Sequence, residues 1–362
     1  MNKVIRAEIE DPARAKEQKK SRPRGGLRPL LKLALFAGGV VAAKAVVRKL
    51  REYDLSGKVV LITGGSRGLG LVLAREFAKE GARIAICARD RQELEQARQE
   101  LVRRGADVFA IPCDVTDRKQ IEDTVLAVQM HFGTLDVLVN NAGIIQVGPM
   151  ESMTHEDYEQ AMNVHFWAPL HASLAALPEM GRKRSGRIIN IASFGGKTAV
   201  PHLLPYSASK FALVGLSEGM RAELLRYGIY VTTVCPALMR TGSHRHAMFK
   251  GQHRKEFTIF SLTGAAPGIS MSAEHVARAI VAACKRGDAE VLSGWTTKLA
   301  STIHGLFPGL TSDVWGTVNR ALPGPGGIRT MQAAGKHSET ELSPSSLTAS
   351  IDRAAIRNNE MQ

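Results

Sequence analysis

The chain has few cysteines and few aromatic residues. Its four cysteines form no Cys-x-x-Cys pair; they are Cys87, Cys113, Cys235 and Cys284. This spacing argues against both a zinc site and a disulfide framework, so we expect buried free thiols in a reducing compartment. Aromatic side chains make up only 5% of the 362 residues, whereas glycine occurs 34 times, a balance typical of an α/β protein with many strand-to-helix turns.

Beyond its first segment the sequence also lacks a strong positive charge. Residues 1–53 hold 14 Lys/Arg and 5 Asp/Glu, a net charge of +9, which leaves +5 of the total +14 for the rest of the chain. The charge distribution therefore argues against a basic body that binds nucleic acid and favours a basic arm beside an anionic partner. We expect no nucleic-acid partner, with binding of nucleic acid by the arm alone as the alternative.

Residues 30–47 form the one long apolar stretch, and Pro29 precedes it at a favourable helix start. As a helix, these 18 residues would span about 27 Å, close to the hydrocarbon thickness of a bilayer. We expect membrane attachment through 30–47, either spanning or lying in the interface, with the following domain in the cytoplasm. An amphipathic helix packed on the protein body is the alternative. A signal peptide is not expected, because 29 mostly polar residues come first.

From Lys58 onward, short apolar runs alternate with amphipathic segments. The expected strands are 59–63, 83–88, 108–111, 135–140, 187–192, 230–235 and 290–293, and the expected helices are 69–79, 91–104, 119–132, 155–177, 207–226 and 273–285. This alternation predicts an α/β fold, a doubly wound parallel sheet of about seven strands with helices on both faces.

Four regions follow from these patterns. We expect a basic N-terminal arm over 1–53, a catalytic domain over 54–294, a helical extension over 295–330 and a disordered polar tail over 331–362. Pro308-Gly309 interrupts the extension, and the run Pro323–Gly327 ends it.

The first expected strand leads directly into a glycine-rich turn, Thr63–Gly70, and a helix follows. Such a turn lets the backbone approach a pyrophosphate, whose charge lies at the helix N-terminus. Its spacing is Gly-x-x-x-Gly-x-Gly, and it lacks the Gly-Lys-Ser/Thr of a nucleoside-triphosphate loop. A purely structural turn is the alternative interpretation.

Five motifs in order resemble the short-chain dehydrogenase/reductase family, over about residues 57–294. They are Thr63–Gly70 (TGxxxGxG), Asp114-Val115, Asn140–Gly143, Asn163, and Ser193 with Tyr206–Lys210. The resemblance implies a Rossmann-type fold and a nicotinamide dinucleotide cofactor. Its cofactor-binding residues would be Gly64, Ser66, Arg67, Gly68, Leu69, Gly70, Arg89, Asp114, Val115, Asn141, Ala142, Gly143, Tyr206, Lys210, Pro236 and Thr241. By the same resemblance, Asp114 holds the adenine amino group.

The end of the second strand indicates which cofactor is bound. Relatives that prefer NAD place an acidic residue there for the ribose 2′-hydroxyl, whereas this sequence has Ala88-Arg89. Together with Arg67, Arg89 suits a 2′-phosphate, so we expect NADP(H). Two solvated surface charges are the alternative.

Tyr206 and Lys210 are spaced i, i+4 and face the same way on a helix. A neighbouring ammonium favours the phenolate, so we expect a lowered tyrosine pKa. In the resemblance, Tyr206 exchanges a proton with the carbonyl or alcohol oxygen, and Lys210 also bonds the nicotinamide ribose. The resemblance also implies that Ser193 holds the reacting oxygen and that Asn163 anchors a water chain to Lys210.

The sequence departs from the family at Pro236-Ala237, where relatives have Pro-Gly, which weakens Thr241 as a cofactor contact. We expect 242–272 to be a mobile cover over the substrate with basic character. His202, His244 and His246 have no metal-ligand spacing, so we expect loop histidines and no metal.

These observations predict an NADP-dependent oxidoreductase that interconverts an alcohol and a carbonyl. Apolar residues in the expected pocket, Val200, Leu203 and Leu204, favour a lipophilic small-molecule substrate. Relatives form oligomers through the helices that match 155–177 and 207–226, so we expect a homo-oligomer. A non-catalytic NADP(H)-binding redox sensor or scaffold at a membrane surface is the alternative.

Overall fold

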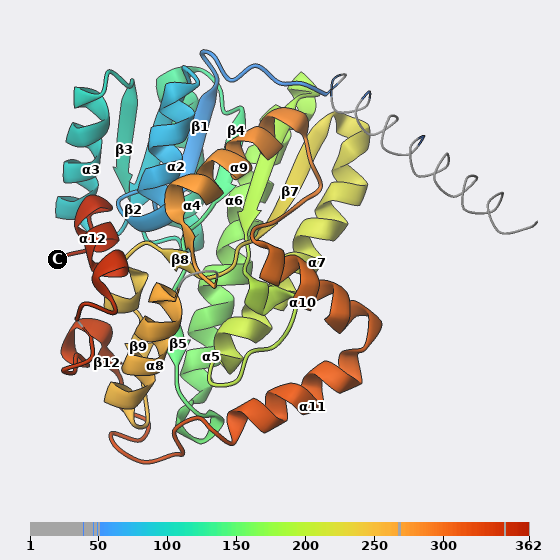
Figure 1. Cartoon of the computed structure of the whole chain (residues 1–362). Coiled ribbons are helices and arrows are strands. Elements are labelled where there is room, and N and C mark those ends of the chain that lie inside the picture. Colours follow the sequence, from blue (N-terminus) through green and yellow to red (C-terminus); the bar gives the residue numbers. More distant parts are fainter. Residues whose placement is uncertain are drawn as a thin grey trace, which may run out of the picture. The chain divides into compact units, whose positions relative to one another are not determined.

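The computed structural model describes residues 39, 46, 49, 51–266, 269–343 and 345–361 (Figure 1). The chain divides into two units, Met1–Leu50 and Arg51–Gln362, and every element named below belongs to the second. The expected membrane helix over 30–47 lies outside the described residues, apart from two isolated positions, and stays a prediction. Within the described part of the chain, no helix is long and apolar enough to cross a membrane.

Seven parallel strands form the central sheet, in the order β11-β7-β6-β4-β1-β2-β3 (Figure 1). Their bounds are Val59–Thr63 (β1), Arg83–Ala88 (β2), Val108–Pro112 (β3), Val137–Asn140 (β4), Gly186–Ile191 (β6), Ile229–Cys235 (β7) and Glu290–Leu292 (β11). All seven match the strands expected from the sequence to within two residues. The doubly wound parallel sheet is confirmed.

Helices cover both faces of this sheet. One face carries Gly68–Lys79 (α2), Arg91–Arg103 (α3) and Ala273–Arg286 (α9); the other carries Arg118–Phe132 (α4), Ala168–Lys183 (α6) and Leu204–Leu224 (α7). Val60 and Ile62 of β1 pack toward α2, whereas Val59 and Leu61 pack toward α4 and α6. Both faces are apolar because both are covered, and each fully buried aliphatic side chain stabilises the fold by about 1.5–3 kcal/mol.

The single helix expected over 155–177 is divided in the structure. His155–Met162 (α5) is followed by a π-helical turn, Asn163–Trp167, before α6 begins at Ala168. Pro169 explains the change, because it has no N–H to give to the carbonyl four residues earlier, and the hydrogen-bond ladder shifts there.

Shorter elements connect these strands and helices. They are Gln146–Val147 (β5), Met239–Arg240 (β8), Met248–Phe249 (β9), Met271–Ser272 (β10), His253–Ala265 (α8) and short 3₁₀ turns at Met150–Ser152, Phe194–Gly196, Leu225–Tyr227, Ser243–Arg245 and Gly335–His337. The helical extension is a pair of helices, Trp295–Leu306 (α10) and Pro308–Asn319 (α11), divided at Pro308 as the sequence indicates (Figure 1).

The C-terminal segment differs from the disordered tail expected over 331–362. Ala333–Ala334 (β12) pairs antiparallel with β9, and Ala349–Arg357 forms helix α12. Ile351, Ala354 and Ala355 share one face of α12 at spacings i, i+3 and i+4, and all three are buried. The polar composition concealed this narrow stripe, whose small side chains allow the helix to pack closely on the body.

Candidate active site

The glycine-rich turn connects β1 to α2 and needs glycine at specific points. Gly64 has φ +64° and Gly68 has φ +56°, which L side chains rarely adopt. A Cβ at Gly64 would lie 2.9 Å from the Ala142 Cα, and one at Gly70 would overlap the Gly64 carbonyl oxygen. The turn is therefore packed against the segment that follows β4, and the N-terminus of α2 opens at the carboxyl edge of the sheet.

Hydrogen bonds hold these two segments together. The Asn141 side chain donates to the carbonyl oxygens of Thr63 (3.0 Å) and Gly64 (3.1 Å). In return, Thr63 Oγ1 accepts from the backbone N–H groups of Asn141 (3.0 Å) and Ala142 (3.1 Å). Asn141 therefore has a structural role, because it ties the segment after β4 to the glycine-rich turn.

A cavity of about 760 Å³ lies at the same edge of the sheet. It brings together three residues that the sequence singled out from distant positions, Arg89 after β2, Asp114 after β3 and Asn163 after α5. Val115 lies apart from it, buried in the core beside α4 and α6. Open parallel sheets bind their ligands at this edge, so the cavity is the candidate dinucleotide cleft.

The two arginines expected to meet a 2′-phosphate have different surroundings. Arg67 Nη1 lies 2.6 Å from Glu93 Oε1, and Ser66 Oγ donates to the same carboxylate at 3.3 Å. Arg89 is exposed and has no ion pair or hydrogen bond among the described residues. The sequence reasoning missed Glu93, although its position in the first turn of α3 places it beside the glycine-rich turn.

Tyr206 and Lys210 lie on α7, and Ser193 follows β6, as the motif spacing predicts. Lys210 Nζ is 5.7 Å from the Tyr206 ring centroid and donates to the Ile191 carbonyl oxygen at 2.8 Å. Ser193 Oγ accepts from the Gly195 N–H at 3.1 Å, which fixes the hydroxyl at the edge of the sheet. The structure therefore places the expected catalytic residues on adjoining elements.

The electrostatics of this group differ from the expectation. Burial raises the pKa of Tyr206, and the hydrogen bond with Ser193 only partly opposes it. Burial also lowers the pKa of Lys210 to about 7. Desolvation thus outweighs the lowering of the Tyr206 pKa that a nearby ammonium would cause. The burial that isolates Tyr206 also disfavours the charged form of Lys210. Tyr206 is held as a neutral phenol, the form that donates a proton.

His165 is a site residue that the motifs did not reveal. It is fully buried, and its ring lies edge-on to Tyr206 at 5.4 Å between centroids. Its Nε2 accepts from the Ile144 N–H at 3.1 Å, so the proton must be on Nδ1, which donates to Ser209 Oγ at 2.8 Å. Ser209 Oγ in turn donates to the Tyr206 carbonyl oxygen at 2.9 Å.

Burial holds the pKa of His165 well below its ordinary value, and the Lys210 charge acts in the same direction. The neutral ring therefore serves as a fixed link between the segment after β4 and the start of α7. The only sequence feature that could have pointed to His165 is its position two residues after the expected Asn163, on the opposite side of the helix.

Asn163 lies in the π-helical turn, and its side chain is exposed in the wall of the cavity. Among the described residues, no hydrogen bond joins it to Lys210 or Tyr206. Pro236 accepts the Phe194 N–H at its carbonyl oxygen (2.9 Å), and Thr241 Oγ1 accepts from the Ser243 N–H (3.2 Å). Thr241 Oγ1 therefore makes a local hydrogen bond within its own turn, and its contact with a cofactor stays a prediction.

Two of the basic residues of 242–272 form ion pairs with carboxylates from distant segments. Lys250 is buried and pairs with Asp157 at 2.5 Å, and Arg245 pairs with Glu339 at 2.7 Å. These carboxylates neutralise the charges of Lys250 and Arg245, whereas Arg254 and Lys255 of the same segment are exposed. The sequence did not reveal these two ion pairs, because both carboxylate partners come from segments far away in the chain.

The histidines of this region also acquire partners from distant segments. His202 Nδ1 lies 2.7 Å from Glu256 Oε1, and His244 Nε2 lies 3.7 Å from Asp352 Oδ1. The residues that the structure describes contain no group of three or more His, Cys, Asp and Glu able to hold a metal ion. All four cysteines are free and buried.

Comparison with known proteins places this site in a family. The short chain dehydrogenase model matches residues 58–250. The chain is 34% identical over 264 residues to the dehydrogenase/reductase SDR family protein 7-like of Anopheles gambiae, covering 69% of this chain and 81% of that protein. It is 38% identical over 182 residues to the ketoacyl reductase HetN of a Nostoc species, covering 50% and 63%.

A solved structure agrees with these sequence matches. An actinorhodin polyketide ketoreductase variant, solved with NADPH, superimposes with a TM-score of 0.60 at 32% identity, covering 66% of this chain and 96% of that one. The chain belongs to the short-chain dehydrogenase/reductase family, with the Rossmann-type fold of that family. It is therefore an oxidoreductase of the nicotinamide-dependent class.

Proposed function

We propose that the chain transfers a hydride between NADP(H) and a carbonyl or alcohol carbon, with Tyr206 as the general acid/base. The observation that carries this proposal is the placement of Tyr206, Lys210 and Ser193 on adjoining elements at the edge of the sheet where the glycine-rich turn opens. Four features that are scattered in the sequence thus meet in one region.

The residues of the cleft fit a dinucleotide. The N-terminus of α2 has room for a polar group, because the Glu360 carboxyl group lies against Gly68 where a Cβ would otherwise fill the space. Gly68–Gly70 would hold the pyrophosphate, Asp114 the adenine amino group, and Arg89 with Arg67 the 2′-phosphate. When bound, the nicotinamide supplies or accepts the hydride.

The protein side chains have separate roles in this chemistry. Ser193 holds the substrate oxygen by a hydrogen bond, and the neutral Tyr206 phenol donates its proton to that oxygen during reduction. Lys210 would bond the nicotinamide ribose, which returns its amine to the charged form that burial disfavours. His165 and Ser209 hold the backbone of Tyr206 in place.

We infer a lipophilic carbonyl as the substrate class from the apolar residues of the loop 194–204. The loop 194–204 carries Val200 and Leu203, and Leu203 packs on a small apolar cluster with Phe249 and Phe257. Trp315 of α11 donates to Thr198 Oγ1 at 3.0 Å, so the C-terminal extension also borders this loop. The ketoacyl and polyketide ketoreductases among the relatives support acyl-chain carbonyls as the first compounds to test.

Tyr206→Phe tests the proposal. The full chain is assayed for oxidation of NADPH with a panel of lipophilic and small polar carbonyls, and NADPH binding is measured separately. We expect Tyr206→Phe to bind NADPH like the wild type and to lose about 10²–10⁴-fold in kcat, because the proton donor is gone.

Tyr227→Phe is the matched control, since Tyr227 is exposed beyond the far end of α7 and contacts Arg226. A Tyr206→Phe variant that keeps more than a third of wild-type kcat would refute the assignment. Binding of NADPH with no turnover of any carbonyl would instead favour the non-catalytic redox sensor or scaffold.

A further inference from the structure

The last residues of the chain return to the glycine-rich turn. Helix α12 packs its buried face, Ile351, Ala354 and Ala355, beside α8 and β8, and the chain then runs onto the N-terminus of α2. Asn359 has φ +58°, a left-handed conformation that asparagine tolerates and that ends the helix with a sharp turn. The tail is therefore directed by its own helix toward the glycine-rich turn.

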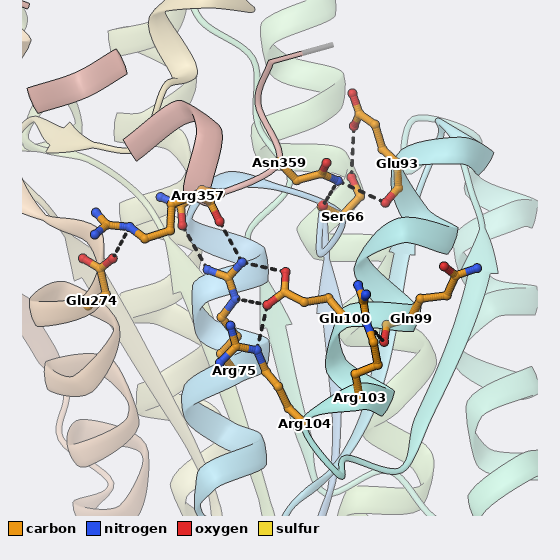
Figure 2. Close-up of polar contacts among 11 residues, drawn as sticks. Ser66, Arg75, Glu93, Gln99, Glu100, Arg103, Arg104, Glu274, Arg357 and Asn359 are labelled. Atoms are coloured by element: carbon orange, nitrogen blue, oxygen red, sulfur yellow. Dashed lines mark hydrogen bonds and ion pairs between the residues drawn. The ribbon is translucent and has the colours of Figure 1, made fainter. Parts of the chain in front are cut away.

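Specific hydrogen bonds fix the tail in that position (Figure 2). The Gly68 N–H donates to the Asn358 carbonyl oxygen at 2.9 Å. The Asn359 side chain donates to the carbonyl oxygens of Ser66 (3.1 Å) and Glu93 (3.2 Å). Arg75 of α2 donates to Asn358 Oδ1 at 3.0 Å and also to the Arg357 carbonyl oxygen at 2.9 Å.

Glu360 completes the contact with a buried carboxyl group. Its residue exposure is only 3%, and its Oε1 occupies the space that a side chain at Gly68 would need. Its Oε2 is buried without a hydrogen-bond partner among the described residues. An unpartnered acid group aimed at a helix N-terminus lies where that terminus would receive a phosphate.

We propose that residues 358–360 are a built-in competitor of the dinucleotide, which must release the tail before it can bind. The inference rests on the proposed function, because it assumes that the cleft takes NADP(H). The Gly68 N–H cannot serve the tail carbonyl and a pyrophosphate together. Glu93, whose carboxylate holds Arg67 and whose backbone holds Asn359, links the tail to the arginine expected at the 2′-phosphate.

Competition makes the measured affinity depend on the docked fraction of the tail. The apparent Kd equals the intrinsic Kd divided by the fraction of molecules with the tail released. Each hydrogen bond changes the docking equilibrium constant by a factor of about five. The loss of two such bonds should therefore raise the released fraction by about five- to thirtyfold. Weakening the tail should therefore tighten NADPH binding although no residue of the cleft is altered.

The experiment measures the Kd of NADPH for the full-length protein and two tail variants. Asn359→Ala removes both side-chain hydrogen bonds of Asn359, and Ala355→Arg forces a large charged side chain into the buried face of α12. We expect both variants to bind NADPH about five- to thirtyfold more tightly than the wild type. Glu341→Ala is the control, since Glu341 is exposed in the same C-terminal segment and does not line the cavity.

Two further readouts separate this proposal from the proposed function. Hydrogen exchange of the tail amides should become faster when NADPH is added to the wild type, and kcat at saturating NADPH should not change in Asn359→Ala. Equal Kd values in all proteins would overturn the competition and leave the proposed function intact. Failure of every protein to bind a dinucleotide would overturn both.

The acid group of Glu360 adds a dependence on pH. Burial raises its pKa to about 8; Arg67 opposes this and Glu93 adds to it. The backbone of Glu360 also contacts His246, whose pKa burial and then Arg67 lower to about 4, so that ring stays neutral. Docking is therefore favoured at low pH, where the carboxyl is protonated, and weakens as the pH rises toward 8.

This dependence is tested by comparing the wild type with Glu360→Gln. From pH 6 to 8, the apparent Kd of the wild type should fall, relative to that of Glu360→Gln, by up to about tenfold per pH unit. Parallel profiles would show that Glu360 does not control docking. The same comparison with Glu341→Gln is the control for loss of a tail carboxylate.

Discussion

The buried amine of Lys210 is expected to destabilise the folded protein, because its charged form is disfavoured by burial. Burial lowers its pKa from 10.5 to about 7, so at pH 6.5 the folded state holds a charge that burial disfavours. At about 1.36 kcal/mol per pKa unit, this amounts to about 4–5 kcal/mol relative to the unfolded chain. Lys210→Met removes the charge and loses the hydrogen bond to the Ile191 carbonyl oxygen, worth about 1 kcal/mol. We therefore expect Lys210→Met to be more stable than the wild type by about 3–4 kcal/mol at pH 6.5, with little turnover.

The sign of the pH dependence follows from proton binding. Between about pH 7 and 10.5 the unfolded chain carries a proton on residue 210 that the folded chain has lost, so wild-type stability rises with pH across this window. The advantage of Lys210→Met should shrink by about 2–3 kcal/mol between pH 6.5 and pH 9.

Urea unfolding followed by tryptophan fluorescence at these two pH values measures the difference. Lys255→Met is the control, because Lys255 is exposed on α8 and should show no such change. A Lys210→Met variant less stable than the wild type at pH 6.5, or a difference that stays constant to pH 9, would refute the reasoning.

Three further predictions concern the cofactor, the support of Tyr206 and the N-terminal arm. NADPH should bind about tenfold to a hundredfold more tightly than NADH, and Ala88→Asp combined with Arg89→Leu should reverse this; equal Kd values in the wild type would contradict it. His165→Phe should lower kcat about 10–100-fold by displacing Tyr206, with the Kd of NADPH near the wild-type value; an unchanged kcat would rule out the positioning role. The full chain should sediment with membranes through 30–47, whereas a chain beginning at Glu52 should not; recovery of the full chain entirely in the detergent-free soluble fraction would defeat this prediction.

The parallel sheet, the glycine-rich turn and the helix that carries Tyr206 and Lys210 could all be predicted from the sequence, because short-range rules govern all three. Apolar runs of strand length between amphipathic segments predict the sheet, and glycine spacing is dictated locally by the backbone of the turn. The i, i+4 spacing of Tyr206 and Lys210 fixes their common face without reference to the rest of the fold.

The surroundings of these residues could not be predicted from the sequence, because they depend on tertiary contacts. Glu93 beside Arg67, and His165 beside Tyr206, depend on contacts between segments that the sequence separates by at least 26 residues. The direction of the Tyr206 pKa shift also needed the structure, because burial depends on the packing of every neighbouring element.

The C-terminal tail shows the same division most clearly. Its composition is polar, and its one apolar stripe consists mainly of alanine, which carries little hydrophobic signal in a sequence pattern. The helix becomes stable only because the folded body offers a matching surface at Gly242, where the Ala355 methyl group packs against the backbone. Such close packing is a property of two distant segments together, so neither one predicts it alone.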